Sequence, residues 1–282
     1  MGRAKLGGVL VGDGAPVGVI GALNVSPESF YAGSVHRDLD DLVRAGEGMV
    51  AAGAVAVDVG ARSTAPYLET AISDGEEAGR LASAVARLAA VLPVPVSADT
   101  AREGAARAAL DAGARIVNDV TALADAGMAR LVAERGAGLI MMAAPGAPPL
   151  RPDPLDTVAA LLEAGLARAR RAGVPDEHVV LDPGIGFFRE AEGLAWHEWD
   201  CRVLAGLEGL AALGRPLCVG VSRKSFLGAV TGRGAVEARL AASLAATAVA
   251  VWNGAALIRT HDVAETLDAV RVAERLAETR RR

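Results

Sequence analysis

The chain has 282 residues, of which 52% are hydrophobic but only 3% aromatic, and its formal net charge is -5. A single α/β barrel with one large core reaches this length, and an interior poor in aromatic residues must be built from Ala, Val and Leu. Acidic and basic residues are mixed along the chain without a basic stripe, which argues against nucleic acid as a partner. The composition therefore favours a globular α/β protein.

The two cysteines and the N-terminal segment indicate the cellular compartment in which the protein is expected. Cys201 and Cys218 match neither a disulfide framework nor the paired spacing of a zinc site. The start of the chain, MGRAKLGGVLVGDG, lacks the apolar segment of a signal peptide, and Leu6 stands where a myristoylation motif needs Ser or Thr. Polar residues and Gly254 interrupt the Ala-rich stretch 240–258, which we interpret as a buried helix leading into a strand. We expect a cytoplasmic protein without membrane association.

Short apolar runs rich in β-branched residues alternate with segments of helical periodicity along the whole chain. The predicted strands are, in chain order, 17–25, 55–61, 94–100, 115–120, 138–144, 178–184, 217–224 and 256–261. Helical segments lie between them, such as 38–53 and 101–113, which end on Gly53 and Gly113.

Eight parallel strands with right-handed helical crossovers close into a barrel, and the Gly-rich first turn of a doubly wound sheet is lacking. We therefore predict an α/β fold, a single-domain (β/α)₈ TIM barrel over residues 17–282, preceded by an N-terminal extension, 1–16. Within this extension, residues 5–16, with the tripeptide GDG at a turn position, are expected to form a small hairpin against the floor of the barrel.

Polar residues end the apolar run of nearly every predicted strand. They are Asn24; Arg62, Ser63 and Thr64; Asp99; Asn118 and Asp119; Asp182; Ser222, Arg223 and Lys224; and Arg259 and His261. Each taken singly is as readily explained by a helix cap or a turn as by ligand binding. Barrels carry their active sites at the carboxyl ends of the strands, so the joint pattern predicts a ligand site there. The run 138–144 ends without a polar side chain, and we expect either an apolar wall or a simple spacer at that position.

The types of these side chains suit a ligand with a polar heterocyclic edge and an anionic group. Asp99, Asn118 and Asp182 can accept hydrogen bonds from ring N–H donors, as carboxylates do from guanidinium. Arg259 and His261 are two residues apart on the last strand, point the same way and suit a phosphate. The simpler alternatives are a surface ion pair for Arg259 and a helix cap for His261.

An ordered set of motifs resembles the dihydropteroate synthase family. The motifs are LNVSPESF (23–30), VDVGARST (57–64), SADT (97–100), IVNDV (116–120), LDPGIGF (181–187), SRKSFLG (222–228) and IRTHDV (258–263). The resemblance covers the chain from about residue 17 to about residue 275. It implies a barrel enzyme of folate biosynthesis that joins 6-hydroxymethyl-7,8-dihydropterin pyrophosphate to p-aminobenzoate and releases pyrophosphate. It also implies a homodimer through residues 236–250 and 265–276, although ordinary core packing explains the Ala content of these segments equally well.

The resemblance also implies a role for each matching residue. The pterin would be held by Asp99, Asn118, Asp182 and Lys224. The pyrophosphate would be held by Asn24, Thr64, Arg259 and His261, with Asn24 also contacting a Mg²⁺ ion. Ser222 would lie near the carboxylate of the arylamine, whose channel Phe187 and Lys224 would line. The residues expected to act in catalysis are Asp99, Asp182, Lys224, Arg259 and His261.

The chain departs from the family pattern on the arylamine side. Ala32 replaces an Asp, Ala65 replaces an Arg, and Arg62 stands where an acid is usual. The segment MMAAPG lacks the usual His and second Met, and Phe188 stands where Gly is common.

These departures leave alternatives open. Either Arg62 or Arg189 supplies the missing charge, or the acceptor is another arylamine of the methanopterin type, or the chain is a paralogue that binds pterin without turnover. A pterin-dependent methyl transfer to a corrinoid protein is a further alternative. The presence of Lys224, Arg259 and His261 argues against this alternative, because methyl transfer requires no binding of pyrophosphate.

Overall fold

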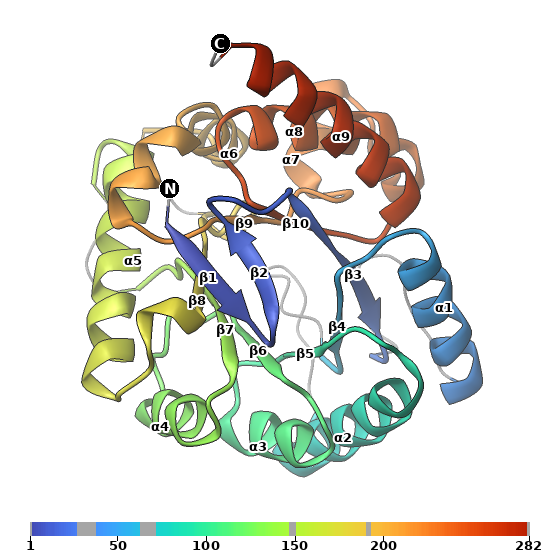
Figure 1. Cartoon of the computed structure of the whole chain (residues 1–282). Coiled ribbons are helices and arrows are strands. Elements are labelled where there is room, and N and C mark those ends of the chain that lie inside the picture. Colours follow the sequence, from blue (N-terminus) through green and yellow to red (C-terminus); the bar gives the residue numbers. More distant parts are fainter. Residues whose placement is uncertain (1, 27–37, 63–71, 147–150, 190–192, 281–282) are drawn as a thin grey trace.

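The computed structural model describes residues 2–26, 38–62, 72–146, 151–189 and 193–280. Eight parallel strands form one sheet in the order β8-β7-β6-β5-β4-β3-β10-β9. They are β3 (Gly18–Asn24), β4 (Ala56–Gly60), β5 (Val96–Asp99), β6 (Ile116–Asp119), β7 (Gly138–Met142), β8 (Val179–Asp182), β9 (Cys218–Val219) and β10 (Leu257–Thr260). A parallel bridge between Leu181 and Leu217 joins the two ends of this sheet. The prediction of a (β/α)₈ barrel is thereby confirmed (Figure 1).

Helices surround the barrel on its outer side (Figure 1). They are α1 (Leu39–Ala51), α2 (Asp74–Val91), α3 (Glu103–Asp111), α4 (Ala126–Arg135), α5 (Pro154–Arg171), α6 (Trp196–Ala205), α7 (Ser225–Thr231), α8 (Leu240–Trp252) and α9 (Val263–Arg280), with the 3₁₀ helices η2 (Asp176–His178), η3 (Leu207–Leu213) and η4 (Val236–Arg239). Several begin at an Asp or Ser whose side chain accepts from a backbone N–H of the first turn, as at Asp38 and Ser73. Gly53 and Gly113 follow α1 and α3 with positive φ, as their positions in the sequence predict.

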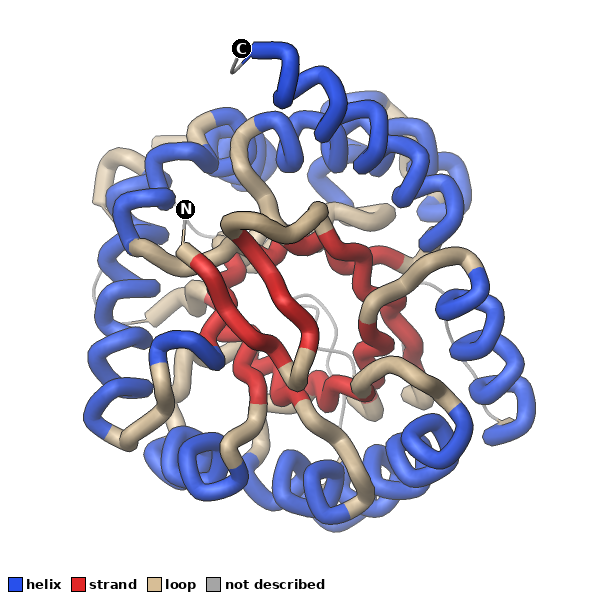
Figure 2. The backbone as a smooth tube through the Cα atoms, in the orientation of Figure 1, coloured by secondary structure: helices blue, strands red, loops and turns tan. Residues whose placement is uncertain are grey.

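An antiparallel hairpin of β1 (Arg3–Leu6) and β2 (Val9–Gly12) lies across the amino-terminal opening of the barrel (Figures 1 and 2). Leu6 and Val11 are buried in one cluster with barrel residues such as Ile116 and Ile140. A hairpin against the barrel floor was predicted correctly, but over the wrong residues: it spans residues 3–12 and turns at Gly7 and Gly8, whereas the GDG segment lies at the end of β2 and leads to β3. A Cβ atom at Gly7 would lie 2.6 Å from Ile116 Cγ1, so the turn approaches the barrel too closely for a side chain.

We expect Leu6→Ala to lower the free energy of unfolding by about 2–5 kcal/mol, because it would leave a cavity between the hairpin and the barrel interior. Urea unfolding followed by circular dichroism measures this change. Leu10→Ala is the matched control, since Leu10 belongs to the same hairpin but is 40% exposed. Equal losses in the two variants would show that the hairpin adds little to the barrel core.

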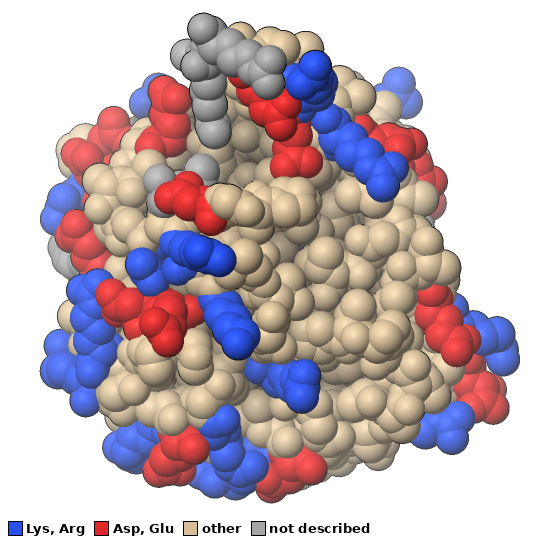
Figure 3. Space-filling view, viewed as in Figure 1, with Lys and Arg blue, Asp and Glu red and all other residues tan. Residues whose placement is uncertain are grey.

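On the hairpin end, acidic and basic groups of both signs lie mainly on the left and around the rim in Figure 3, and a broad area without charged groups lies right of centre. Among the described residues, no single helix is long and apolar enough to cross a membrane. Residues 225–231 and 236–252 pass that test only as a pair, which is bent by 78°. As predicted, the Ala-rich α8 leads into β10, and it buries small residues such as Ser243 and Ala246.

Candidate active site

The predicted site residues gather at the carboxyl end of the barrel, opposite the hairpin. Asn24, Asp99 and Asp182 are the last residues of β3, β5 and β8, and Asn118 is next to last in β6. The others lie in β10 or in the loops that follow β8, β9 and β10. They are Phe187, Ser222, Lys224, Arg259 and His261. Thr64, Ala32 and Ala65 lie outside the described residues.

A charged cluster lies at the centre of this end. Arg259 donates from Nε to Asp58 Oδ2 at 2.6 Å and from Nη2 to Asp99 Oδ2 at 2.8 Å. The same Asp58 oxygen accepts from Asn118 Nδ2 at 3.0 Å. One arginine of β10 thus links two carboxylates from β4 and β5, and an amide of β6 completes the network.

Sequence reasoning missed Asp58. It lies inside the apolar run VAVDVGA and not at the end of a strand, and its side chain is 0% exposed. Charged residues are almost never fully buried unless they are paired, so a lone Asp in the middle of a buried strand is a usable signal. Asp58 therefore belongs to the candidate site, as the residue that fixes Arg259 and Asn118.

Burial and charge set the protonation of this cluster. Burial raises the pKa of Asp99 to about 7, although the neighbouring Arg259 acts to lower it. Burial acts to lower the pKa of Arg259, but the carboxylates of Asp58 and Asp99 outweigh it and raise that pKa. Arg259 is therefore a permanent cation, whereas Asp99 titrates near neutral pH.

Asp182 and Lys224 influence each other through their charges, and both bond to the loop that follows β8. Asp182 Oδ1 accepts from the backbone N–H of Gly184 at 2.8 Å, and Lys224 Nζ donates to the carbonyl of Ile185. The ammonium also lies 5.1 Å from the centre of the Phe187 ring. Burial raises the pKa of Asp182 and lowers that of Lys224, while their mutual attraction opposes both shifts.

The glycines of the DPGIGF motif let this loop approach Lys224. Gly184 and Gly186 have φ of +74° and +86°. A Cβ atom on Gly186 would lie 3.1 Å from Lys224 Cδ. Glycine is thus required both for the turn and for the close packing of the lysine stem.

His261, which follows β10, pairs with Ser222, which lies in the loop after β9. Ser222 Oγ and His261 Nδ1 are 3.0 Å apart, and the hydroxyl also accepts from the backbone N–H of His261 at 3.3 Å. Burial lowers the pKa of His261 to about 3, and Arg259 acts in the same direction. The imidazole is therefore neutral at pH 7 and offers hydrogen bonding but no charge to a ligand.

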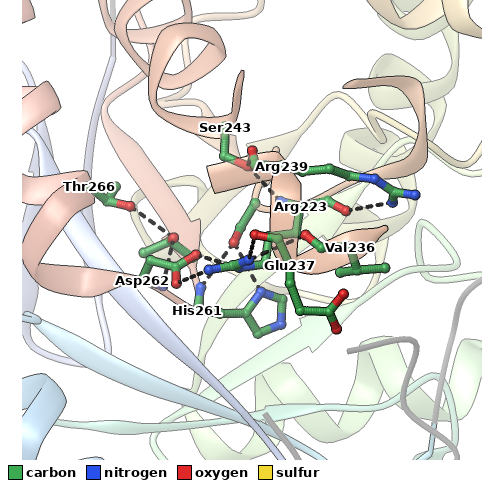
Figure 4. A network of polar contacts seen from close by, with 10 residues as sticks. Arg223, Val236, Glu237, Arg239, Ser243, His261, Asp262 and Thr266 are labelled. Carbon is green, nitrogen blue, oxygen red and sulfur yellow. Dashed lines mark hydrogen bonds and ion pairs between the residues drawn. The ribbon is translucent and has the colours of Figure 1, made fainter. Parts of the chain in front are cut away.

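Arg223 supports the turn that presents Ser222 and Lys224. Its φ is +53°, which is unfavourable for a residue with a side chain. A two-pronged ion pair with Asp262, at 2.9 and 2.8 Å, and bonds to the carbonyls of Val236 and Glu237 hold it there (Figure 4). The ion pair between Arg223 and Asp262 thus joins the motifs SRK and RTHD. Arg223 has a structural role, which the sequence did not indicate.

Arg189 and Arg62, the two candidates for a compensating charge, face different partners. Arg189 Nη2 donates to Ser225 Oγ at 2.6 Å, and its guanidinium lies 4.0 Å from the Trp196 ring centre. Arg62 Nε lies 3.6 Å from Glu77 Oε2, an oxygen to which Arg102 donates. Since Ser225 follows Lys224 directly, this geometry favours Arg189 as the cation beside the loop of Phe187.

Two further departures from the family pattern have packing explanations. Phe188 is buried and stacks on Trp199 with the ring centres 5.1 Å apart. Met141, Met142 and Ala143 at the end of β7 are buried, and Met141 packs toward Gly165 of α5. Asp119, in contrast, accepts from the backbone N–H of Thr121 and Leu123 and therefore shapes a turn.

The family resemblance assigns Asn24 to a Mg²⁺ ion, and an amide oxygen is a ligand type that Mg²⁺ accepts. Its amide oxygen lies near Gly60, where a Cβ atom would be 3.4 Å from Asn24 Oδ1 and 3.6 Å from Asp99 Oδ2. No group of three or more His, Cys, Asp or Glu side chains among the described residues is arranged to hold a metal ion. Mg²⁺ usually binds through one or two protein oxygens together with substrate phosphates and water, and this donor set fits that mode.

Comparisons with known proteins agree with this geometry. The family of pterin binding enzymes matches residues 20–261. A dihydropteroate synthase of Mycobacterium leprae is 42% identical over 272 residues, which cover 92% of this chain and 93% of the relative.

Solved structures show the same likeness. Xanthomonas albilineans dihydropteroate synthase with 4-aminobenzoic acid has a TM-score of 0.86 and 35% identity, covering 97% of both chains. The enzyme of that organism in complex with 7,8-dihydropteroate has a TM-score of 0.83 and 34% identity, covering 97% of this chain and 98% of the other. The chain therefore belongs to the family of pterin binding enzymes, with full-length relatives that are dihydropteroate synthases.

Proposed function

We propose that the chain condenses 6-hydroxymethyl-7,8-dihydropterin pyrophosphate with p-aminobenzoate and releases pyrophosphate, as a dihydropteroate synthase of folate biosynthesis. The observation that carries the proposal is the Asp58–Arg259–Asp99 cluster with Asn118 at the carboxyl end of the barrel. Buried carboxylates and an amide at this end of the barrel suit the donor-rich edge of a pterin, and the arginine beside them suits an anionic leaving group.

In this proposal the pterin ring lies among Asp99, Asn118, Asp182 and Lys224. The two aspartates accept hydrogen bonds from ring N–H groups. Since burial raises the pKa values of both, their ionised forms are poorly solvated and gain from a donor-rich ligand. Lys224 donates to an acceptor on the ring.

The reaction needs positioning and charge stabilisation and no protein nucleophile. When the bond between the pterin methylene carbon and the pyrophosphate oxygen breaks, positive charge develops on the pterin and negative charge on the leaving group. Asp99 and Asp182 stabilise the first of these charges and Arg259 the second. The neutral amine nitrogen then forms the C–N bond to the methylene carbon, and its proton passes to water or to the departing pyrophosphate.

The pyrophosphate in this proposal is held by Asn24, Thr64, Arg259 and His261. Arg259 donates one N–H to Asp58 and one to Asp99, and its guanidinium has further N–H donors for phosphate oxygens. Neutral His261 contributes a hydrogen bond. We propose that Asn24 contacts a Mg²⁺ ion, which would neutralise charge on the leaving group.

The arylamine in this proposal occupies the side of the site formed by Phe187, Lys224 and Ser222. Its carboxylate is expected to lie near Ser222, with Arg189 as the nearby cation. The bond from Arg189 to Ser225, next to Lys224, supports that choice over Arg62, which faces Glu77. The changes at Ala32 and Ala65 are then compatible with p-aminobenzoate as the acceptor.

We also propose that the protein is a cytoplasmic homodimer that pairs through α8 and α9. Both helices carry exposed apolar side chains, Val249 and Trp252 on α8 and Val272 and Leu276 on α9. Free Cys201 and Cys218 suit a reducing compartment. Light scattering should give a dimer mass for the native chain and a monomer mass for the double variant Val272→Glu, Leu276→Glu. A native monomer would contradict the proposed assembly.

The experiment that tests the function measures pyrophosphate release from the pterin substrate with Mg²⁺, with and without p-aminobenzoate. Release that depends on p-aminobenzoate, together with dihydropteroate as product, is the expected result. Pterin binding without product would instead point to another arylamine or to a paralogue without turnover. A preference for methylated folates would point to methyl transfer.

A further inference from the structure

Asp200 is a buried carboxylate next to the candidate site that the proposed mechanism does not use. It lies in the middle of α6, with 0% exposure. Its Oδ1 accepts from the backbone N–H of Gly186 at 2.7 Å. Within the described part of the chain, no protein group donates to its Oδ2.

The contact to Gly186 links Asp200 to Lys224 through a single peptide group. The N–H of Gly186 and the carbonyl of Ile185 belong to the same planar unit. In a trans peptide these two groups point in opposite directions. Asp200 accepts from the N–H at one end, and Lys224 Nζ donates to the carbonyl at the other. Hydrogen bonds in such a chain polarise and strengthen one another.

We propose that Asp200 is a positioning residue for Lys224 and acts through the Ile185–Gly186 peptide group. The carboxylate orients this peptide so that its carbonyl faces the ammonium, and its negative charge favours the protonated lysine. The relevance of this inference to catalysis rests on the proposed function, because that function assigns Lys224 to the pterin site. The link between Asp200 and Lys224 does not depend on it.

Holding the Gly186 N–H in place does not by itself explain why residue 200 carries a negative charge. One neutral acceptor would suffice to hold the Gly186 N–H, whereas a second buried carboxylate oxygen without a donor costs free energy. Attraction to the lysine ammonium offsets part of this cost. Burial raises the pKa of Asp200 to about 6, while the Gly186 N–H and the charges of Lys224, Arg189 and His197 oppose the shift. Asp200 is therefore mostly ionised at pH 7.5.

Lys224 is subject to four charged neighbours. Burial acts to lower its pKa, Asp182 and Asp200 act to raise it, and Arg259 and Arg189 act in the same direction as burial. Loss of the Asp200 charge should therefore lower the pKa of Lys224. It should also loosen the peptide that precedes Phe187, whose ring lies beside the ammonium.

The chain offers a direct test because it contains only two lysines, Lys5 and Lys224. Protein labelled with [ε-¹³C]lysine gives one carbon signal for each, and Lys5→Arg assigns them. The pKa of Lys224 is read from a pH titration of its signal in wild type, in Asp200→Asn and in Asp200→Ser. Both variants remove the charge. Asn keeps an acceptor at the reach of Oδ1, and the shorter Ser provides a second neutral variant if Asp200→Asn does not fold.

We expect the pKa of Lys224 to fall by at least about 0.5 unit in either neutral variant. Glu198→Gln is the matched control, because it removes the same charge from α6 at an exposed position and should leave the pKa of Lys224 unchanged. An unchanged pKa in the Asp200 variants would overturn the inference.

Kinetics then separate the inference from the proposed function. If the chain is a synthase, Asp200→Asn should raise KM for the pterin substrate several-fold and move the alkaline limb of the pH profile down together with the pKa of Lys224. A shifted pKa in a chain without synthase activity would leave the link between Asp200 and Lys224 standing and reject the proposed function. If the pKa of Lys224 and the synthase kinetics of Asp200→Asn both equal those of wild type, the link between Asp200 and Lys224 is rejected and the proposed function stands.

Discussion

Replacing Arg259 with Met is expected to lower the free energy of unfolding by about 3–5 kcal/mol and to abolish synthase activity. Arg259 is the cation that links Asp58 and Asp99, at 2.6 and 2.8 Å. Its removal leaves two buried carboxylates without their ion-pair partner. Breaking a buried pair by removing one partner is costly because the remaining charge is neither solvated nor paired. Thermal or urea unfolding measures the stability, and pyrophosphate release measures the activity.

The pH dependence of this loss distinguishes lost charge from lost packing. The pKa of Asp99 is already raised by burial, and losing Arg259 removes the group that acts to lower it. A raised carboxylate pKa means that the folded state holds the proton more tightly than the unfolded state, so stability falls as the pH rises through neutrality. The deficit of Arg259→Met should therefore shrink from pH 8 to pH 6.

Arg87→Met provides the control for this experiment, since Arg87 forms an exposed pair with Asp40 and should cost at most about 1 kcal/mol. A deficit of Arg259→Met that is independent of pH would mean that its side chain acts by packing alone.

The sequence predicts the barrel well because its signal is local and repeated. Each of the eight apolar runs contains an observed strand, and Gly53 and Gly113 lie just beyond their helices as predicted. The largest difference is at residues 217–224, of which only Cys218–Val219 is strand. The rest of this run turns at Arg223, which is held by Asp262 and by backbone carbonyls of residues 236 and 237. Such support from distant residues leaves no periodic signal.

The candidate site was less predictable than the fold, for a similar reason. The carboxyl-end rule identifies residues that end strands, but it passes over Asp58 within β4 and Asp200 within α6. Arg259 was expected to serve an anion, yet its described partners are Asp58 and Asp99, which lie 201 and 160 residues away in the chain. Those pairings follow from closure of the barrel, which places β10 next to β3 and close to β4 and β5.

Asp182→Ala is expected to reduce pterin affinity by about 10²-fold or more. Each hydrogen bond between a charged group and its partner contributes about 1.5–3 kcal/mol, and every 1.4 kcal/mol corresponds to a factor of ten in affinity. A carboxylate that accepts two N–H groups of the pterin therefore accounts for a loss of this size. Calorimetric titration with a pterin that lacks the pyrophosphate isolates this contact from those made to the anion.

Asp125→Ala is the matched control for this change. Asp182 accepts from the N–H of Gly184 and Asp125 from that of Gly127, in both cases two residues along the chain, at 2.8 and 2.7 Å. Both variants lose the same local hydrogen bond, but Asp125 is the N-cap of α4 and is exposed. Loss of pterin binding in Asp182→Ala alone assigns the effect to the ligand and not to the turn. Unchanged affinity in that variant would exclude Asp182 from the pterin site and leave Asp99, Asn118 and Lys224 as its remaining polar contacts.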